Sequence, residues 1–372
     1  MRSLLILFAT INVLNGMSQD SYFLVTGTYT NGKSEGIYIH EFNTKTGDAK
    51  PLNVVKGIKN PSYLAVSPDE KYVYAVSEQN NAGNGGRVYA YSFDKLSANM
   101  QEINSQPSGG DDPCYISVDN TGKWVVVGNY SSGSLKAMRV MDGRLQEDSR
   151  VIRHTGHSIN KERQEKPHVH CTYFDANNKY LYVPDLGIDK VMIYRFNVNN
   201  GDLFNVGSAG VELGSGPRHI IISPNGKYAY LMEEIKGRVS VFSVSSQTGT
   251  LDKIQTISSA AVGFTGDMGS ADIHLTQDGK FLYASNRGEA NDIAIFSVDG
   301  LNGTLTKIGN QPVLGIAPRN FSFDPTENFL LVANMNSNEV VIFARNSNNG
   351  LLTDTGKRIS IPTPVCLKWI GK

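Results

Sequence analysis

The chain has 372 residues, with 35 Lys and Arg against 35 Asp and Glu, so its formal net charge is zero. A zero net charge argues against a general nucleic-acid binder, which needs a basic surface to displace counterions from phosphates. A hydrophobic content of 40% can bury a large core and excludes a disordered chain, and 37 glycines with 17 tyrosines favour short strands joined by tight turns.

The first twenty residues, MRSLLILFATINVLNGMSQD, have the form of a secretory signal peptide. Arg2 supplies a positive start, the stretch from Leu4 to Leu14 is mostly apolar but too short to span a bilayer, and Gly16 and Ser18 suit a cleavage site. We therefore expect residues 1–19 to be removed and the mature protein to be periplasmic or secreted, without membrane association. The alternative is a buried first strand, in which case the protein is cytoplasmic.

Beyond this segment, one sequence pattern recurs six times. Each copy has a short β run, a turn of the type D/P-x-G-K, a second β run, a polar loop and then V-x-x-F/Y. The copies begin at Pro61, Pro113, Val169, Pro217, Ser270 and Pro318, and a seventh start at Pro364 ends the chain. The starts are 46 to 56 residues apart, a period typical of β-propellers built from four strands per blade.

The seventh start supplies only one strand. The strands that would complete its blade stand at the other end of the chain, at residues 22–29 and 36–42. A blade shared between the two ends closes the ring and leaves no open sheet edge. The sequence thus predicts an all-β, seven-bladed β-propeller with four-stranded antiparallel blades, forming a single domain over residues 20–372.

Two positions of the repeat are expected to surround the same mouth of the propeller. The first strand of a blade runs from one face to the other and the second strand returns, so residues just after each start and those 17 positions after it lie at one face. One place after the start the chain carries His170, Arg218 and Arg319, and 17 places after it Glu234 and Arg287. These positions are chemically diverse, whereas the turns at the opposite face are uniform, which marks the diverse face as functional.

Residues beside these positions widen the candidate site. His168, Asp185, His219 and Asn334 each flank a strand start or a strand end at the same face. The loop of residues 150–170 is the longest departure from the repeat and carries five Arg and Lys residues. It either covers the mouth with positive charge or is an ordinary solvated loop.

The residue types at the mouth suit acyl chemistry. Arginine binds carboxylate or phosphate through paired hydrogen bonds, and near a carbonyl it stabilises a developing oxyanion. Glu234 or His170 is placed to take a proton from water or substrate. These parts fit hydrolysis of an ester or lactone that bears an anionic group. Each residue also has a purely structural interpretation, as an ion pair or a buried imidazole.

Other chemistries have weaker support in the sequence. No motif for a metal site, a nucleotide or a serine nucleophile is present, so we expect neither a metal nor a cofactor. His168 and His170 form an H-x-H pair that lacks further spaced ligands. The cysteines Cys114, Cys171 and Cys366 are far apart and lie in strand-like runs, so we expect buried thiols and no disulfide.

Long stretches of the chain match a known family pattern. They are RQEKPHVH (163–170), DLGIDKV (185–191), GPRHIIISPNGKYAY (216–230), ADIHLTQDGKFLYASNRG (271–288) and PRNFSFDPTENFLLVANM (318–335), with GTYT (27–30) and PTPVC (362–366) at the ends. In these stretches the chain resembles the seven-bladed β-propeller lactonase family, of the bacterial 6-phosphogluconolactonase type. That family is related to fungal carboxymuconate-lactonizing enzymes, whose proposed site uses a histidine, two arginines and a glutamate without a metal.

The resemblance implies a metal-independent hydrolysis of 6-phospho-D-glucono-1,5-lactone to 6-phosphogluconate. Carried over by motif, it implies the catalytic residues His170, Arg218, Glu234 and Arg287. The neighbouring residues are then expected to bind substrate, namely His168, Asp185, His219, Arg319 and Asn334. One departure is Glu233, where the family has Asn. Another is the export signal, because the phosphorylated lactone is a cytosolic metabolite, so a non-phosphorylated aldonolactone is also considered.

Three functional hypotheses follow. The first is a lactonase, monomeric or weakly dimeric, whose partner is a small anionic lactone and no nucleic acid or membrane. The second is a non-catalytic exported propeller that binds an anionic sugar or a protein, since fold alone does not give function. The third is a muconate-type lactonizing enzyme acting on an acyclic acid.

Overall fold

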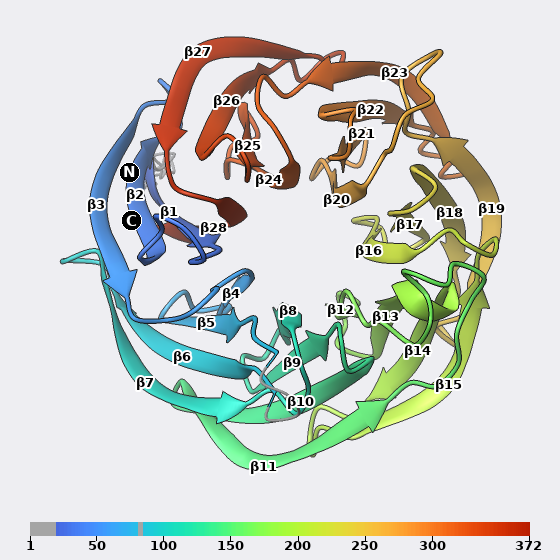
Figure 1. Cartoon of the computed structure of the whole chain (residues 1–372), viewed down its shortest axis with the longest axis horizontal. Coiled ribbons are helices and arrows are strands. Elements are labelled where there is room, and N and C mark those ends of the chain that lie inside the picture. Colours follow the sequence, from blue (N-terminus) through green and yellow to red (C-terminus); the bar gives the residue numbers. More distant parts are fainter. Residues whose placement is uncertain (1–19, 81–84) are drawn as a thin grey trace, which may run out of the picture.

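Seven four-stranded antiparallel sheets surround a central axis like the blades of a propeller (Figure 1). The computed structural model describes residues 20–80 and 85–372. The predicted all-β, seven-bladed fold is confirmed, and the one helical element in the described part of the chain is a short 3-10 turn, η1 (Leu186–Ile188). The predicted signal peptide at residues 1–19 lies outside the described residues.

Each blade is a simple meander, and its strands follow one another from the axis outward (Figure 1). The second blade contains β4 (Leu64–Val66), β5 (Tyr72–Ser77), β6 (Arg87–Asp94) and β7 (Asn99–Pro107). The third contains β8 (Pro113–Val118), β9 (Trp124–Asn129), β10 (Ser134–Met141) and β11 (Arg144–Arg153). The fourth contains β12 (Tyr173–Phe174), β13 (Tyr180–Asp185), β14 (Lys190–Phe196) and β15 (Leu203–Gly210). The fifth contains β16 (Pro217–Ile222), β17 (Tyr228–Glu233), β18 (Arg238–Val244) and β19 (Leu251–Ser258). The sixth contains β20 (Ser270–Leu275), β21 (Phe281–Asn286), β22 (Asp292–Val298) and β23 (Leu305–Pro312). The seventh contains β24 (Pro318–Phe323), β25 (Phe329–Asn334), β26 (Glu339–Arg345) and β27 (Leu352–Ser360).

The first blade joins the two ends of the chain. Its strands, again from the axis outward, are β28 (Pro364–Gly371), β1 (Ser21–Thr28), β2 (Gly36–Asn43) and β3 (Ala49–Lys56). β28 pairs with β1 antiparallel, from Tyr22 opposite Gly371 to Thr28 opposite Pro364. This pairing confirms the predicted closure, because it completes a four-stranded blade from the two ends of the chain.

The blades pack on one another through the side chains that alternate along their strands. Tyr182, Tyr230 and Tyr283 occupy the same position of three repeats and are fully buried. Each phenol donates to the carbonyl of a glycine in the outer hairpin of the next blade, from Tyr182 to Gly249 at 3.1 Å and in the same way in the two blades that follow. A buried hydroxyl needs such a partner, so each bond also fixes the register of neighbouring blades.

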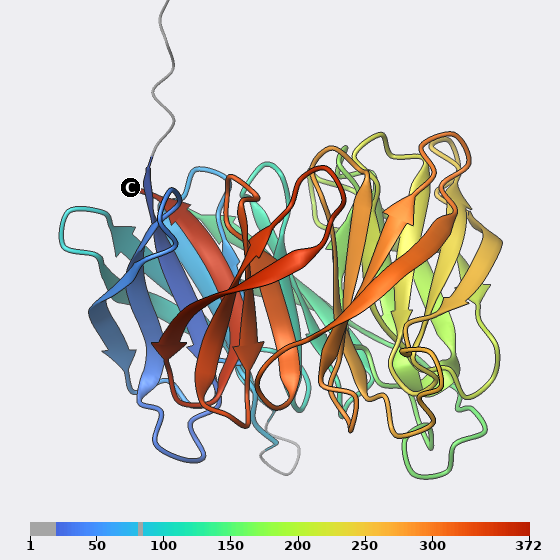
Figure 2. The ribbon, with the colours of Figure 1, turned by 90° about the horizontal axis from the view of Figure 1, so that it is seen from above.

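The two faces of the disc differ as the repeat predicts. The D/P-x-G-K turns lie at one face, where Gly122, Gly226 and Gly279 have φ near 70°, a left-handed conformation that glycine adopts at little cost. The innermost strands begin at the other face, which we call the mouth face. The C-terminus lies away from it (Figure 2). Within residues 20–80 and 85–372, no helix is long and apolar enough to cross a membrane.

Candidate active site

A β-bulge opens the innermost strand of several blades at the mouth face. In the fifth blade Pro217 pairs with Glu233 and His219 with Met232, so Arg218 is an extra residue in the ladder. Arg319 in the seventh blade and Cys114 in the third sit on the same irregularity. Bulges redirect side chains locally, and here the residue one place after the repeat start is the one that is redirected.

His170, Arg218 and Glu234 meet at the mouth of the pore. Nη1 of Arg218 donates to Oε2 of Glu234 at 2.8 Å and also to Nε2 of His170. Nε of Arg218 donates to the carbonyl of Ala271 at 2.8 Å, which fixes the plane of the guanidinium group. The exposed fractions are 2% for Arg218 and 4% for both Glu234 and His170, so this is a buried, charged cluster.

Two more arginines complete the surroundings of the carboxylate. Nη2 of Arg287 lies 3.3 Å from Oε1 of Glu234, while its Nε donates to the carbonyl of Gly269 at 2.7 Å. Nη2 of Arg163 donates to the same Oε1 at 2.7 Å and to the hydroxyl of Tyr130 at 3.2 Å. Both oxygens of Glu234 are therefore held by guanidinium groups, three in total.

Arg163 decides between the two interpretations of the basic loop. It belongs to residues 150–170 and reaches across the mouth to the fifth blade, so the loop does bring positive charge over the site. Arg163 and Tyr130 were absent from the predicted site residues. The departure of the loop from the repeat length and the position of Tyr130, 17 places after a repeat start, are the sequence signals that point to them.

The arginines set the protonation states of the cluster. Burial alone would raise the pKa of Glu234, but the charges of Arg287 and Arg218 outweigh it and hold that pKa well below its ordinary value. Burial and the charge of Arg218 lower the pKa of His170 well below its ordinary value, so the ring is neutral near pH 7. Because an arginine can only donate, Nε2 of His170 is the accepting nitrogen.

The positive charge at the mouth exceeds the negative charge. Burial and the charge of Arg218, together with that of Arg319, lower the pKa of Arg287 to about 9. Burial is the main cause of this shift, and the three guanidinium groups around Glu234 carry more positive charge than its one carboxylate offsets. The mouth is thus arranged to receive a negatively charged group.

Arg319 lies on a second polar cluster at the same mouth. Its guanidinium group stacks 5.3 Å above the ring of Tyr29 and has no hydrogen bond or ion pair within the described part of the chain. The hydroxyl of Tyr29 donates to the carboxylate of Glu78 at 3.0 Å, and Ser62 also donates to that carboxylate. Tyr29 and Glu78 were not among the predicted site residues, although Glu78 occupies the repeat position of Glu234.

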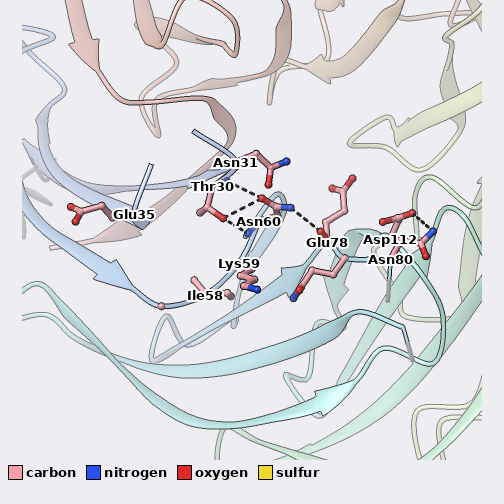
Figure 3. Close-up of a pocket in the computed structure, with 11 residues that line it drawn as sticks. Thr30, Asn31, Glu35, Ile58, Lys59, Asn60, Glu78, Asn80 and Asp112 are labelled. Atoms are coloured by element: carbon pink, nitrogen blue, oxygen red, sulfur yellow. Dashed lines mark hydrogen bonds between the residues drawn. The ribbon is translucent and has the colours of Figure 1, made fainter. Parts of the chain in front are cut away.

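Two concave regions open at this face. A cleft of about 500 Å³ is lined by Arg163, Glu234 and Arg287, so the charged cluster is reached from solvent. A cavity of about 670 Å³ lies beside the second cluster, where Asn60 links Thr30 to the backbone of Glu78 (Figure 3). The lining of this cavity consists mostly of amide, hydroxyl and carboxylate groups, which suit the hydroxyl groups of a sugar.

Not every predicted site residue reaches the mouth. Asp185 is fully buried, accepts from the backbone N–H of His168 at 2.7 Å and pairs with His154 at 2.6 Å, so it holds the loop and caps η1. Asn334 is fully buried and donates to the carbonyl of Val313, which follows the outer strand of the preceding blade, at 3.2 Å.

The remaining two predicted residues lie beside the cluster. His168 stacks on Tyr130 with 4.4 Å between ring centres, and Tyr130 in turn contacts the ring of His170. The ring of His219 lies 5.3 Å from that of His170, and its Nδ1 is bonded to Asp272 and not directed into the cleft.

The cysteines are free and buried, as predicted. Cys114 lies 3.8 Å from Nδ1 of His170, and burial raises the pKa of its thiol, so it packs against the cluster as a neutral group. Among residues 20–80 and 85–372 no group of three or more His, Cys, Asp or Glu side chains is arranged to hold a metal ion.

Comparison with known proteins supports the same family over almost the whole chain. The family model "Lactonase, 7-bladed beta-propeller" matches residues 23–369. A 6-phosphogluconolactonase of Bacillus subtilis is 37% identical over 94% of this chain and 98% of its own length, and one of Formosa agariphila is 40% identical over 88% and 94%. The structure of a periplasmic gluconolactonase of Pseudomonas aeruginosa superposes with a TM-score of 0.88 at 36% identity, covering 94% of this chain and 99% of that one. The chain therefore belongs to the seven-bladed β-propeller lactonase family.

Proposed function

We propose that the protein hydrolyses the 1,5-lactone of a sugar acid, 6-phosphogluconolactone or a closely related aldonolactone, without a metal ion. The observation that carries the proposal is the buried carboxylate of Glu234, held by three guanidinium groups at the wall of a solvent-reached cleft. The names of the similar proteins, 6-phosphogluconolactonase and gluconolactonase, support the substrate class.

The contacts of the cluster suggest which step of the reaction each residue serves. Glu234 lines the cleft and His170 does not, so we assign to Glu234 the role of orienting a water molecule and accepting its proton. The water oxygen attacks the lactone carbonyl carbon, and Arg287 with Arg163 stabilises the negative charge that develops on the carbonyl oxygen. The ring C–O bond then breaks, and the proton passes to the departing ring oxygen, which becomes the hydroxyl of the product acid.

A panel of lactones tests this proposal. Purified protein should accelerate the opening of 6-phosphogluconolactone or gluconolactone above the spontaneous rate, and a chelator should leave that rate unchanged. Binding without turnover across the whole panel would favour a non-catalytic sugar-binding propeller. Ring closure of an unsaturated acyclic diacid, with no lactone hydrolysis, would favour a lactonizing enzyme, and loss of activity with chelator would refute metal independence.

Arg319 is the residue we expect to recognise the negative charge of the substrate. Its guanidinium group stacks on the ring of Tyr29 but makes no hydrogen bond or ion pair in the described part of the chain. Its N–H donors are therefore available to a ligand. Arg319→Gln should lower kcat/KM for the phosphorylated lactone by about 10- to 100-fold, the value of one hydrogen bond between charged groups, and should change kcat/KM for neutral gluconolactone little.

Arg358→Gln is the matched control for this prediction, because Arg358 pairs with Asp354 on the outer strand of a blade, away from the cleft. An equal loss for both lactones in Arg319→Gln would show that Arg319 supports the site and does not read the charge.

We further propose that the mature protein is periplasmic or secreted, and that it works as a monomer or weak dimer. The apolar N-terminal stretch supports export, and one similar protein is a periplasmic gluconolactonase. Every residue of the charged cluster comes from one chain, so no second subunit is needed. Cell fractionation and light scattering of the purified protein test the two proposals.

A further inference from the structure

A second ring of side chains lies beneath the charged cluster. It consists of the residues two places after each repeat start, Tyr63, Tyr115, Cys171, His219, Asp272, Asn320 and Cys366, and we call it the second ring. Tyr63 stacks on Tyr115 at 4.1 Å, and Tyr115 contacts His219 at 5.2 Å edge to face. Tyr115 and His219 belong to blades that are not neighbours, so these rings meet across the axis.

Asp272 is the centre of the polar half of this ring. Its Oδ1 accepts from Nδ1 of His219 at 2.7 Å, and its Oδ2 is bonded to Nε2 of His274 at 3.0 Å and to Asn320. Asp272 is 3% exposed, and the backbone N–H groups of Ile273 and Phe321 also donate to its carboxylate, so hydrogen bonds within the protein stabilise its charge. The amide oxygen of Asn320 accepts in turn from the backbone N–H of Leu367 at 2.8 Å, which extends the network to the closing blade.

His219 is held in an unusual state for a buried histidine. It is 5% exposed, and its Nε2 has no hydrogen-bond partner among residues 20–80 and 85–372. Burial lowers the pKa of His219 to about 4, so the neutral ring donates from Nδ1 and leaves Nε2 with an unused lone pair. A buried polar atom without a partner costs free energy, whereas the bond of Nδ1 to Asp272 stabilises the same ring.

The bond between His219 and Asp272 joins two blades at the point where Arg218 is anchored. His219 follows Arg218 on β16, and Asp272 follows Ala271 on β20. Nε of Arg218 donates to the carbonyl of Ala271, 2.8 Å away. Two successive residues of β16 are thus tied to two successive residues of β20, once by the guanidinium group and once by the imidazole.

We propose that Asp272 and His219 act as a positioning pair for the reaction. By fixing β16 against β20 they aim the guanidinium group of Arg218 at Glu234 and His170. The proposal rests on the lactonase function stated above, because the effect of the pair reaches the substrate through Arg218. Neither residue touches the cleft, so neither is a catalytic residue.

Kinetics of three variants test the pair. Asp272→Asn and His219→Phe should each lower kcat by about 10- to 100-fold with KM close to the wild-type value, as expected when a supporting group of a site is lost. His219→Phe keeps an aromatic ring beside His170 and serves if Asp272→Asn does not fold. The double variant should be no slower than the worse single one, because the two residues act as one unit.

His274→Gln is the matched control. His274 bonds to the other oxygen of the same carboxylate and contacts no residue of the cleft, so kcat should stay near wild type. Additive losses in the double variant, or equal losses in His274→Gln, would overturn the proposal and reduce the network to a structural one.

A second readout does not depend on activity. The Nε–H of Arg218, bonded to Ala271, should give a slowly exchanging nitrogen-15 NMR signal that is absent in Arg218→Lys. We expect this signal to exchange faster in Asp272→Asn and His219→Phe while the backbone amides of β16 stay protected. An unchanged signal would overturn the proposal. If the wild type opened no lactone, the proposed function would fail and this signal would still decide the positioning role.

Discussion

Replacing Glu234 by glutamine is expected to lower kcat for lactone opening by about 10²- to 10³-fold, the usual cost of losing a general base or a preorganised charge. The amide keeps the size of the side chain but can neither accept the proton of the attacking water nor hold three guanidinium groups. The variant also removes the anion that offsets Arg163, Arg218 and Arg287. Affinity for an anionic product should therefore stay equal or rise, which calorimetry with the sugar acid can measure.

The chain offers a close control for this variant. Glu212 is also paired with two cations, Lys236 and Arg238, and its pKa is lowered by them to about 2, but its side chain is 59% exposed and lies outside the cleft. Glu212→Gln should leave kcat unchanged. If both variants kept wild-type rates, Glu234 would have no part in the chemistry and the proposed mechanism would be wrong.

The repeat allowed the fold to be predicted because each blade repeats the same physical solution. Gly122, Gly226 and Gly279 meet the same demand for a left-handed turn, and the shared blade follows from counting strands at the two ends of the chain. Long-range closure is normally hard to infer from sequence. Here the single strand at the C-terminal end, β28, pairs with β1 at the other end of the chain and completes the blade.

The site was predicted less completely, and the reason is visible in two adjacent repeat positions. Asn129, Asn286 and Asn334 lie 16 places after their repeat starts, and each donates to the backbone carbonyl of the residue that follows the outer strand of the preceding blade. Asp185 occupies the same position and likewise binds backbone N–H groups. Position 16 is the last residue of the second strand, and its side chain holds the segment that joins two blades, so the similarity of these polar residues is a structural signal.

The diverse side chains of the site lie 17 places after the repeat starts and at the bulge, one place after the starts. The contacts between these side chains could not be predicted from the sequence. The bulge at Arg218 is a backbone irregularity without a residue signature. The approach of Arg163 depends on the path of a long loop. Both require the tertiary structure, whereas the repeat alone placed His170, Arg218, Glu234 and Arg287 at one mouth.

Loss of Arg218 is expected to cost stability as well as activity. Arg218→Met removes a 2% exposed guanidinium group that serves Glu234, His170 and the carbonyl of Ala271. Breaking a buried pair by removing one partner costs about 3–5 kcal/mol. Two guanidinium groups remain beside Glu234, but the orphaned carbonyl adds its own cost. Urea unfolding should show this loss, and Arg358→Met, which breaks an exposed pair, should cost less than about 1 kcal/mol.

The double variant with Glu234→Gln separates the pair from the general effect of a new side chain. If the charge left on Glu234 causes the loss, the double variant should be less destabilised than the sum of the two single ones. Simple additivity would instead place the cost in the packing of the methionine.

The destabilisation should also depend on pH in a direction that Glu234 determines. In the wild type the folded-state pKa of Glu234 lies below the ordinary value of 4.5, so its ionised form stabilises the fold above about pH 4.5 and this contribution is lost as the pH falls through the folded-state pKa. Without Arg218 the effect of burial is less opposed and the pKa of Glu234 rises, so the variant takes up a proton at a higher pH than the wild type. The difference in unfolding free energy should therefore be largest near neutral pH and narrow below about pH 4.5. A difference that stays constant through this range would mean that Arg218 stabilises the fold by packing and not through the charge of Glu234.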